Sequence, residues 1–191
     1  MSAKVSGVVL AGGQGRRMGG VDKGLQVLGG KAMIEHVIER LAPQVDEIVI
    51  NANQNLDRYG NLGYKVAPDV TGGFAGPLAG LQAGLQAATH PLVVTAPCDS
   101  PFLPLDLVSR LAAALGHRQL AVAKTGDQPH PVFALVRRDL LDHLTAYLAG
   151  GGRKIDAWYA SLDVVEVPFD DEADAFSNIN TREELRAHEE S

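Results

Sequence analysis

The chain has 191 residues, of which 46% are hydrophobic and 21% are charged, and its formal net charge is −6. These values are typical of one globular domain with a sizeable core, so we expect residues 1–191 to form a single domain. The acidic balance argues against a broad nucleic-acid-binding surface.

Cysteine content and hydropathy exclude further classes of protein. The only cysteine is Cys98, which excludes an intrachain disulfide and a cysteine-based zinc site. The apolar run near the N-terminus is too short for a signal peptide, and no segment has the length of a membrane span. We therefore expect a cytoplasmic protein that does not bind a membrane.

Strand-like and helix-like patterns alternate along the chain. Short apolar runs predict strands at Val5–Leu10, Val45–Asn51, Tyr64–Ala67, Leu92–Ala96, Leu120–Lys124, Val132–Val136 and, at a late edge, Val164–Val167. Apolar residues at three- and four-residue spacing predict helices at 33–41, 77–85, 107–115 and 140–148, and a capping box at 181–184 predicts a last helix. This alternation predicts an α/β fold: a three-layer αβα sandwich with a mostly parallel, Rossmann-like sheet.

The segment after the first strand is the strongest candidate site, because parallel sheets bind ligands beyond the carboxyl ends of their strands. The sequence GVVLAGGQGRRMGGVDKGL, residues 7–25, combines many glycines with Arg16, Arg17 and Lys23. Glycines let backbone N–H groups approach an anion. The loop fits neither a Walker motif nor a dinucleotide fingerprint, because Asp22 precedes the lysine and Met18 replaces a required glycine. We predict a phosphate-binding loop of a third kind, and a solvated glycine-rich loop is the alternative.

Polar residues follow the later strands as well. Asn51 can hydrogen-bond a base or sugar, or it can simply terminate its strand. Glycine pairs around Pro77 flank a helix start, which is either a second anion contact or a flexible connection. Asp99 follows a buried strand in LVVTAPCDSPFLP, and a carboxylate opposite a phosphate loop favours Mg²⁺, with a turn role as the alternative. Cys98 is expected to pack, and His130 lies where a loop at the sheet edge could present it.

The stretch VVLAGGQGRRMGGVDKGL resembles the opening of nucleotidyltransferases that join an NTP to a phosphorylated acceptor. The similarity is closest to the molybdenum cofactor guanylyltransferases, and it extends over nearly the whole chain through VINANQ, PDVTGGFAGPLAG, PCDSPFLP, HPVFAL and FSNINTREEL. The resemblance implies that GTP and a molybdopterin-type cofactor react to give the guanine dinucleotide form and pyrophosphate, with Mg²⁺ as the metal cofactor.

The resemblance also implies roles for individual residues. Contacts to the nucleotide fall on Leu10, Ala11, Gly12, Gly13, Gly15, Lys23, Asn51, Asp69 and Asp99, with Asp99 also the Mg²⁺ ligand. The catalytic residues are Lys23, Arg17 and Asp99, Gly20 lies in a glycine pair before Lys23, and Asn178 and Asn180 match an asparagine pair near the acceptor.

The acceptor is expected on the side of the cleft away from GTP. A pterin edge pairs with amide side chains, and a terminal phosphate suits a guanidinium. These features favour Asn178, Asn180, Arg153 and His130. The alternatives are that the glycines before Arg153 end a helix and that Asn180 supports a helix cap. Transient contact with proteins that deliver or receive the cofactor is also expected.

Other functions stay open at this stage. A cytidylyltransferase or a sugar-1-phosphate nucleotidyltransferase would use the same fold, because the base preference cannot be derived from the residues. A non-catalytic GTP-binding sensor is the alternative from another class of protein. Asp99 favours an enzyme over a sensor, because a sensor needs no catalytic metal.

Overall fold

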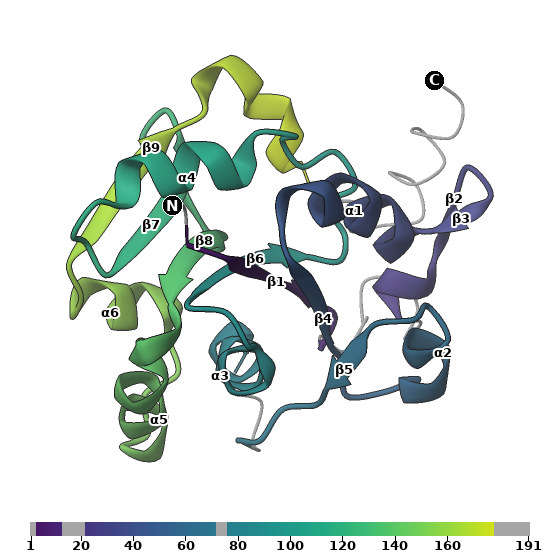
Figure 1. Ribbon diagram of the computed structural model, residues 1–191, viewed down its shortest axis with the longest axis horizontal. Coiled ribbons are helices and arrows are strands. Elements are labelled where there is room, and N and C mark those ends of the chain that lie inside the picture. The colour runs from purple at the N-terminus through teal and green to yellow at the C-terminus, as the bar shows by residue number, and fades with distance from the viewer. Residues whose placement is uncertain (1–2, 13–21, 72–75, 178–191) are drawn as a thin grey trace.

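The structure is a computed structural model, and it describes residues 3–12, 22–71 and 76–177. Within these residues, seven strands form one sheet in the order β5-β4-β1-β6-β8-β7-β9, and helices cover both of its faces (Figure 1). The predicted α/β fold with three layers is confirmed.

The strands of the sheet follow the predicted runs closely. Their bounds are β1 Val5–Leu10, β4 Glu47–Asn51, β5 Lys65–Ala67, β6 Leu92–Pro97, β7 Leu120–Thr125, β8 Gln128–Arg137 and β9 Val164–Pro168. A separate hairpin consists of β2 Val27–Leu28 and β3 Lys31–Ala32. All the strands of the main sheet run in one direction except β8, which is antiparallel to both β6 and β7. The carboxyl ends of the parallel strands therefore meet at one edge of the sheet.

The helices form two layers. They are α1 Met33–Leu41, α2 Leu56–Gly60, α3 Pro77–Ala87, α4 Leu107–Leu115, α5 Leu141–Ala149 and α6 Ile155–Ala160, with short 3₁₀ helices η2 Lys23–Leu25, η3 Ala42–Gln44, η4 Arg138–Leu140 and η5 Asp170–Phe176. Figure 1 shows α1 and α4 on one side of the sheet and α3 and α5 on the other. No helix within the described residues is long and apolar enough to span a membrane.

Strand β1 shows how the sequence builds these layers. Its residues alternate between the faces, so that Val8 packs with α3 while Val9 packs in the core beneath α1. Helix α3 lies very close to the strand. The close approach is evident at Gly84, where an added Cβ would come within 2.7 Å of the methyl groups of Val8. Apolar burial on both faces holds β1 at the centre of the sheet and fixes where its carboxyl end lies.

The region around β8 differs from the prediction. The strand begins at Gln128, four residues before the predicted start, and a two-residue turn at Gly126–Asp127 joins it to β7. His130 therefore lies within the strand and not in a loop before it. Pairing between β6 and β8 ends at Val94–Leu135, and beyond it the Thr95 hydroxyl donates to the Val132 carbonyl at 2.8 Å. The amino-terminal part of β8 thus lies at the same sheet edge as the ends of β1 and β6.

Two short helices were not predicted, and one prediction falls outside the described residues. Helix α2 has five residues and α6 has six, lengths at which an apolar stripe gives little signal. The basic segment GGGRKID, residues 150–156, was expected as a loop, but Ile155 and Asp156 form the first turn of α6. The capping box at 181–184 lies beyond the described residues.

Candidate nucleotide-binding site

The carboxyl end of β1 is held from both sides. The Ala11 N–H donates to the Asn51 carbonyl at 2.7 Å, and the Cys98 N–H donates to the Leu10 carbonyl at 3.1 Å. Ala11 is buried and Leu10 is half-buried. Backbone hydrogen bonds from β4 and from the segment after β6 therefore fix the point at which the glycine-rich segment leaves the sheet.

A network of polar side chains joins β1, β4 and the segment after β5. The Asn51 amide donates to the Ala67 carbonyl at 3.0 Å and to Asp69 Oδ1 at 2.9 Å. Asn53 accepts from the Asp69 N–H at 2.8 Å and donates to the Gly12 carbonyl at 3.3 Å. The predicted nucleotide contacts Asn51 and Asp69 thus lie together. Asn51 is only 2% exposed, and its amide N–H groups bind Ala67 and Asp69, so its side chain holds these two residues in place.

Two glycines allow this network to pack. A Cβ at Gly12 would lie 3.0 Å from the side chains of both Asn51 and Asn53. A Cβ at Gly80, in the first turns of α3, would lie 2.4 Å from Asn51 Oδ1 and 2.8 Å from Leu10. Real Cβ atoms do not approach this closely, so α3 can begin beside the end of β1 only because Gly80 has no side chain. Pro77 occupies the first turn of α3, as predicted.

Lys23 and Asp99 face each other across the ends of β1 and β6. Lys23 begins η2, Asp99 follows β6, and their Nζ and Oδ2 atoms are 3.6 Å apart. The lysine side chain is 25% exposed and the aspartate side chain 9%. The structure therefore brings together the cation predicted to bind phosphate and the carboxylate predicted to bind metal.

The surroundings of Asp99 suit Mg²⁺ shared with a substrate. No group of three His, Cys, Asp or Glu side chains that could hold a metal occurs among residues 3–12, 22–71 and 76–177. Mg²⁺ commonly takes one or two carboxylates and completes its octahedron with phosphate oxygens and water. The buried Asp99 carboxylate beside Lys23, the cation predicted to bind phosphate, fits that mode of binding better than it fits a metal held by protein ligands alone.

Asp22 anchors η2 to α2. Its Oδ1 accepts from the Tyr59 hydroxyl at 2.5 Å and from the Gly24 N–H at 3.2 Å, and its Oδ2 accepts from the Asn55 amide at 3.2 Å. Both Asp22 and Tyr59 are buried. Burial, with the neighbouring Cys98 and the hydrogen bond to Asp22, raises the pKa of Tyr59 far above its usual range, so the hydroxyl keeps its proton and donates it.

Cys98 behaves as a packing residue, as expected. It is buried against Gly24, and its Sγ would lie 3.4 Å from a Cβ placed there. Burial, followed by the nearby charges of Asp99 and Asp22, raises the pKa of its thiol well above its usual range. The neutral thiol is a poor nucleophile, which is consistent with a structural role.

His130 lies on the other side of the same sheet edge. Its ring stacks on Phe176 of η5 with centroids 4.7 Å apart and an angle of 8° between the planes, and its Nε2 lies 2.7 Å from the Thr125 hydroxyl. Burial lowers the pKa of His130, which favours the neutral imidazole. Arg153 donates from Nη1 to the Leu148 and Gly152 carbonyls, so part of its guanidinium caps the end of α5.

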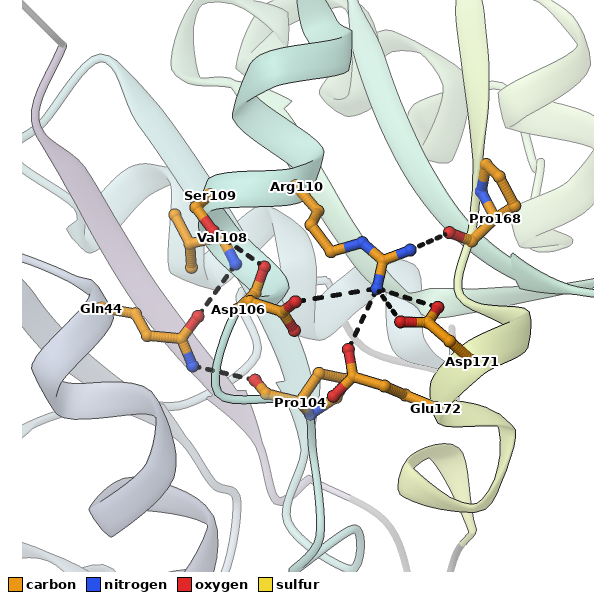
Figure 2. Close-up of polar contacts among 9 residues, drawn as sticks. All are labelled: Gln44, Pro104, Asp106, Val108, Ser109, Arg110, Pro168, Asp171 and Glu172. Carbon is orange, nitrogen blue, oxygen red and sulfur yellow. Dashed lines mark hydrogen bonds and ion pairs between the residues drawn. The ribbon is translucent and has the colours of Figure 1, made fainter.

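Helix η5, which supports His130, is held by Arg110 of α4. Figure 2 shows its guanidinium among three carboxylates, with Nη1 at 3.1 Å from Asp171, 3.0 Å from Glu172 and 3.7 Å from Asp106. Nη2 donates to the Pro168 carbonyl at 2.6 Å, and the guanidinium lies 4.1 Å from the centre of the Phe169 ring. We call Arg110 with these three carboxylates the Arg110 clamp.

Several predicted site residues lie outside the described residues, namely Gly13, Gly15, Arg17, Gly20, Asn178 and Asn180. Other residues were missed by the sequence reasoning and are revealed by the structure. Asp22 was noted only as the residue that breaks a Walker motif, and Asn53 only as part of a strand end. Tyr59 and Asn55 gave no signal, because their link to Asp22 spans more than thirty positions without any periodicity.

Comparison with known proteins identifies relatives of this chain. The sequence matches the family described as a MobA-like NTP transferase domain over residues 7–164. A molybdenum cofactor guanylyltransferase from Cupriavidus taiwanensis is 55% identical over 192 residues, which cover 97% of this chain and 96% of the relative. The enzyme of that name from Burkholderia vietnamiensis is 54% identical, with coverage of 98% and 96%.

Solved structures give the same fold. The crystal structure of molybdopterin-guanine dinucleotide biosynthesis protein A from Archaeoglobus fulgidus has a TM-score of 0.77 and 28% identity and covers 97% of both chains. A 4-diphosphocytidyl-2C-methyl-D-erythritol synthase from Anaerococcus prevotii has a TM-score of 0.75 at 15% identity, over 98% of this chain and 95% of its own, and this likeness concerns the fold alone. Together, the family match and the high identity to curated relatives place the chain in the molybdenum cofactor guanylyltransferase family of MobA-like NTP transferases.

Proposed function

We propose that the protein transfers GMP from GTP to the phosphate of a molybdopterin-type cofactor, giving the guanine dinucleotide form and pyrophosphate. The observation that carries this proposal is the meeting of Lys23 and Asp99 at the carboxyl ends of β1 and β6, with Nζ and Oδ2 3.6 Å apart. The names of the curated relatives support the choice of GTP and of the acceptor.

The reaction requires that the acceptor phosphate and GTP be positioned and that the charge on the triphosphate be neutralised. It requires no covalent nucleophile from the protein. An oxygen of the acceptor phosphate attacks the α-phosphorus of GTP, the bond from the α-phosphorus to the bridging oxygen breaks, and pyrophosphate leaves. Lys23 and Arg17 would neutralise charge on the triphosphate, and backbone N–H groups of Gly13 and Gly15 would hold it. Guanine and ribose would contact Leu10, Ala11 and Gly12, beside Asn51 and Asp69.

Mg²⁺ is the metal that we expect with the nucleotide. Asp99 would hold it, because this carboxylate is buried at the strand ends and faces Lys23. When bound, the ion would draw negative charge away from the phosphates of GTP. Asp99 would also keep Lys23 extended toward the triphosphate through their ion pair.

The acceptor would occupy the β8 side of the sheet edge. The half-buried His130 offers a neutral imidazole there, and Arg153 lies just beyond the end of α5. We assign these two residues, together with Asn178 and Asn180, to the acceptor. The amide groups would pair with the pterin edge, and the guanidinium would attract the terminal phosphate. Transient contacts with proteins that deliver or receive the cofactor, in the cytoplasm, belong to the same proposal.

One experiment tests both the substrate and the reaction. Purified protein would be given molybdopterin, Mg²⁺ and either GTP, CTP, ATP or UTP, and both pyrophosphate and the dinucleotide product would be measured. We expect product with GTP at a specificity constant well above that for the other nucleotides. A comparable value for CTP would indicate a cytidylyltransferase, and GTP binding without any product would indicate a sensor.

A further inference from the structure

Asp22 is a buried carboxylate whose partners come from a different segment of the chain. It is 8% exposed, and it accepts hydrogen bonds from Tyr59 and Asn55 as well as from the backbone of Gly24. A buried carboxylate is costly unless donors surround it, so these contacts are strongly maintained in the folded state. They tie the 3₁₀ helix η2 to helix α2.

The packing around this carboxylate leaves the backbone little freedom. A Cβ at Gly24 would lie 2.6 Å from the Tyr59 hydroxyl, so the backbone of η2 lies directly against that oxygen. Tyr59 itself is fully buried. Asn55 adopts a left-handed conformation with φ 53°, which places its amide near Asp22 at the start of α2. Helix α2 therefore fixes the positions of the two residues that flank Lys23.

Fixing both neighbours of Lys23 fixes where its side chain starts and which way it points. The ammonium group reaches Asp99 at 3.6 Å, on the side where the phosphates are expected. A preorganised cation loses less freedom when a ligand binds, so its contact with the ligand is worth more. We propose that Asp22, Asn55 and Tyr59 form a positioning site for Lys23, through which α2 sets the affinity of the protein for the triphosphate. This inference rests on the proposed function.

The first test removes one hydroxyl and keeps the ring that fills the core. Tyr59→Phe should raise the dissociation constant for GTP with Mg²⁺ about fivefold to tenfold, because a hydrogen bond to a charged group is lost. The KM for GTP should rise by a similar factor, while kcat and the KM for the acceptor stay near wild type. Calorimetry and steady-state kinetics would be done well below the melting temperature, which circular dichroism would establish.

The matched control is Tyr159→Phe. The Tyr159 hydroxyl also donates a hydrogen bond, to the Pro131 carbonyl at 2.6 Å, but it lies with α6 on the opposite face of the sheet. Its loss should lower the melting temperature without changing the affinity for GTP. Equal losses of GTP affinity in the two variants would mean that any lost hydroxyl weakens binding, and would overturn the positioning role.

A swap of side chains provides a second test. Asp22→Asn removes the negative charge that accepts hydrogen bonds from Tyr59, Asn55 and the Gly24 N–H, and should weaken GTP binding at least as much as Tyr59→Phe. The double variant Asp22→Asn with Asn55→Asp returns a carboxylate to the cluster opposite an amide donor, and should recover a measurable part of the affinity. If the double variant recovers melting temperature but no GTP affinity, Asp22 only caps η2 and the proposal is wrong.

These outcomes are separable from the proposed function. If the wild-type protein makes the dinucleotide and Tyr59→Phe leaves both the affinity and the KM for GTP unchanged, the positioning role is wrong and the function stands. If the wild-type protein binds GTP but makes no product, the function is wrong. The calorimetric affinities of the variants then still decide the positioning role.

Discussion

The Lys23–Asp99 pair and the Arg110 clamp lie at the same edge of the sheet, yet their charges are arranged differently. In the clamp, the guanidinium of Arg110 forms ion pairs with Asp171, Glu172 and Asp106, and its shortest distance to a carboxylate oxygen is 3.0 Å. At the nucleotide side, the distance from Lys23 Nζ to Asp99 Oδ2 is 3.6 Å. The Asp99 side chain is 9% exposed, whereas the Asp171 side chain is 68% exposed.

The difference separates a charge cluster that stabilises the fold from one that suits a ligand. In the clamp, a planar guanidinium with several donors also stacks on an aromatic ring, so its interactions are satisfied within the protein. A single ammonium and a single carboxylate at longer distance interact more weakly, and burial makes the carboxylate expensive. We therefore expect phosphates and a metal ion to bind at the Lys23–Asp99 pair, as proposed above, whereas the contacts of the clamp lie within the protein.

The largest effect is expected at Asp99. Asp99→Asn keeps the shape of the side chain and removes its charge. The activation free energy should therefore rise by about 4 kcal/mol, so that turnover falls roughly a thousandfold. Pyrophosphate release at saturating GTP and Mg²⁺ measures this loss, and a thermal melt checks that the fold is kept. Turnover within tenfold of wild type would contradict the metal assignment.

The second effect compares two cations directly. Lys23→Ala should weaken GTP binding by about 1.5–3 kcal/mol, because a charge-assisted contact to phosphate is lost. Arg110→Met should leave GTP binding unchanged, since its partners are the carboxylates of the clamp. Calorimetric titration of both variants decides the matter. Equal losses of affinity would remove the distinction between the two clusters.

The third effect concerns stability. Arg110→Met keeps the aliphatic stem but leaves three carboxylates without their shared cation. We expect a loss of about 1 kcal/mol in the free energy of unfolding, or roughly 2–4 °C in melting temperature. Lys23→Ala is the control, and its melting temperature should be closer to that of the wild type. A larger loss in Lys23→Ala than in Arg110→Met would reverse the comparison.

The smallest effect is a dependence of stability on pH. A hydrogen bond with Asp106, then desolvation and the charges of Asp106 and Asp171, raise the pKa of Glu172 against the opposing effect of Arg110. Among the described residues, Asp106 Oδ1 is buried without a hydrogen-bond partner, and a proton on Glu172 would supply the missing donor. Because the folded-state pKa is raised, this stabilisation is present at acidic pH and is lost as pH rises through that pKa.

The test compares Glu172→Gln with wild type by thermal melts at pH 4 and pH 7.5. The wild-type protein should gain stability relative to the variant at the acidic pH, by less than about 1 kcal/mol for so exposed a group. Comparing two proteins at each pH cancels the titration of all other groups. An identical difference at both pH values would rule out a shared proton between Asp106 and Glu172.

The layers of the fold could be predicted because they depend on local periodicity. Strand β1 coincides with its prediction, and α1 coincides with its apolar stripe. The direction of β8 could not be taken from its apolar residues, because a buried strand has the same pattern in either orientation. The two-residue turn at Gly126–Asp127, with φ 56° at the glycine, is the one local signal for the hairpin.

The candidate site could be predicted only where its residues follow a strand. Asp99 and Asn51 were predicted in this way, since the carboxyl ends of parallel strands converge. The contacts of Asp22 with Tyr59 depend on how α2 packs, and packing between distant segments leaves no pattern in a single sequence. For the same reason, the hydrogen bonds of the Asn51 amide to Ala67 and Asp69 could not be predicted, and the contact of Asn51 with the nucleotide stays a prediction.

The burial of Cys98 beneath Gly24 has a practical consequence for measuring motion. It is the only cysteine in the chain, so a thiol reagent can label one position without any engineering. Gly24 of η2 packs against its buried side chain, so a reagent should react faster whenever the backbone of η2 moves away from the end of β6. The rate of labelling therefore reports how often the backbone beside Lys23 opens locally. It can be measured in the unmodified protein and independently of turnover.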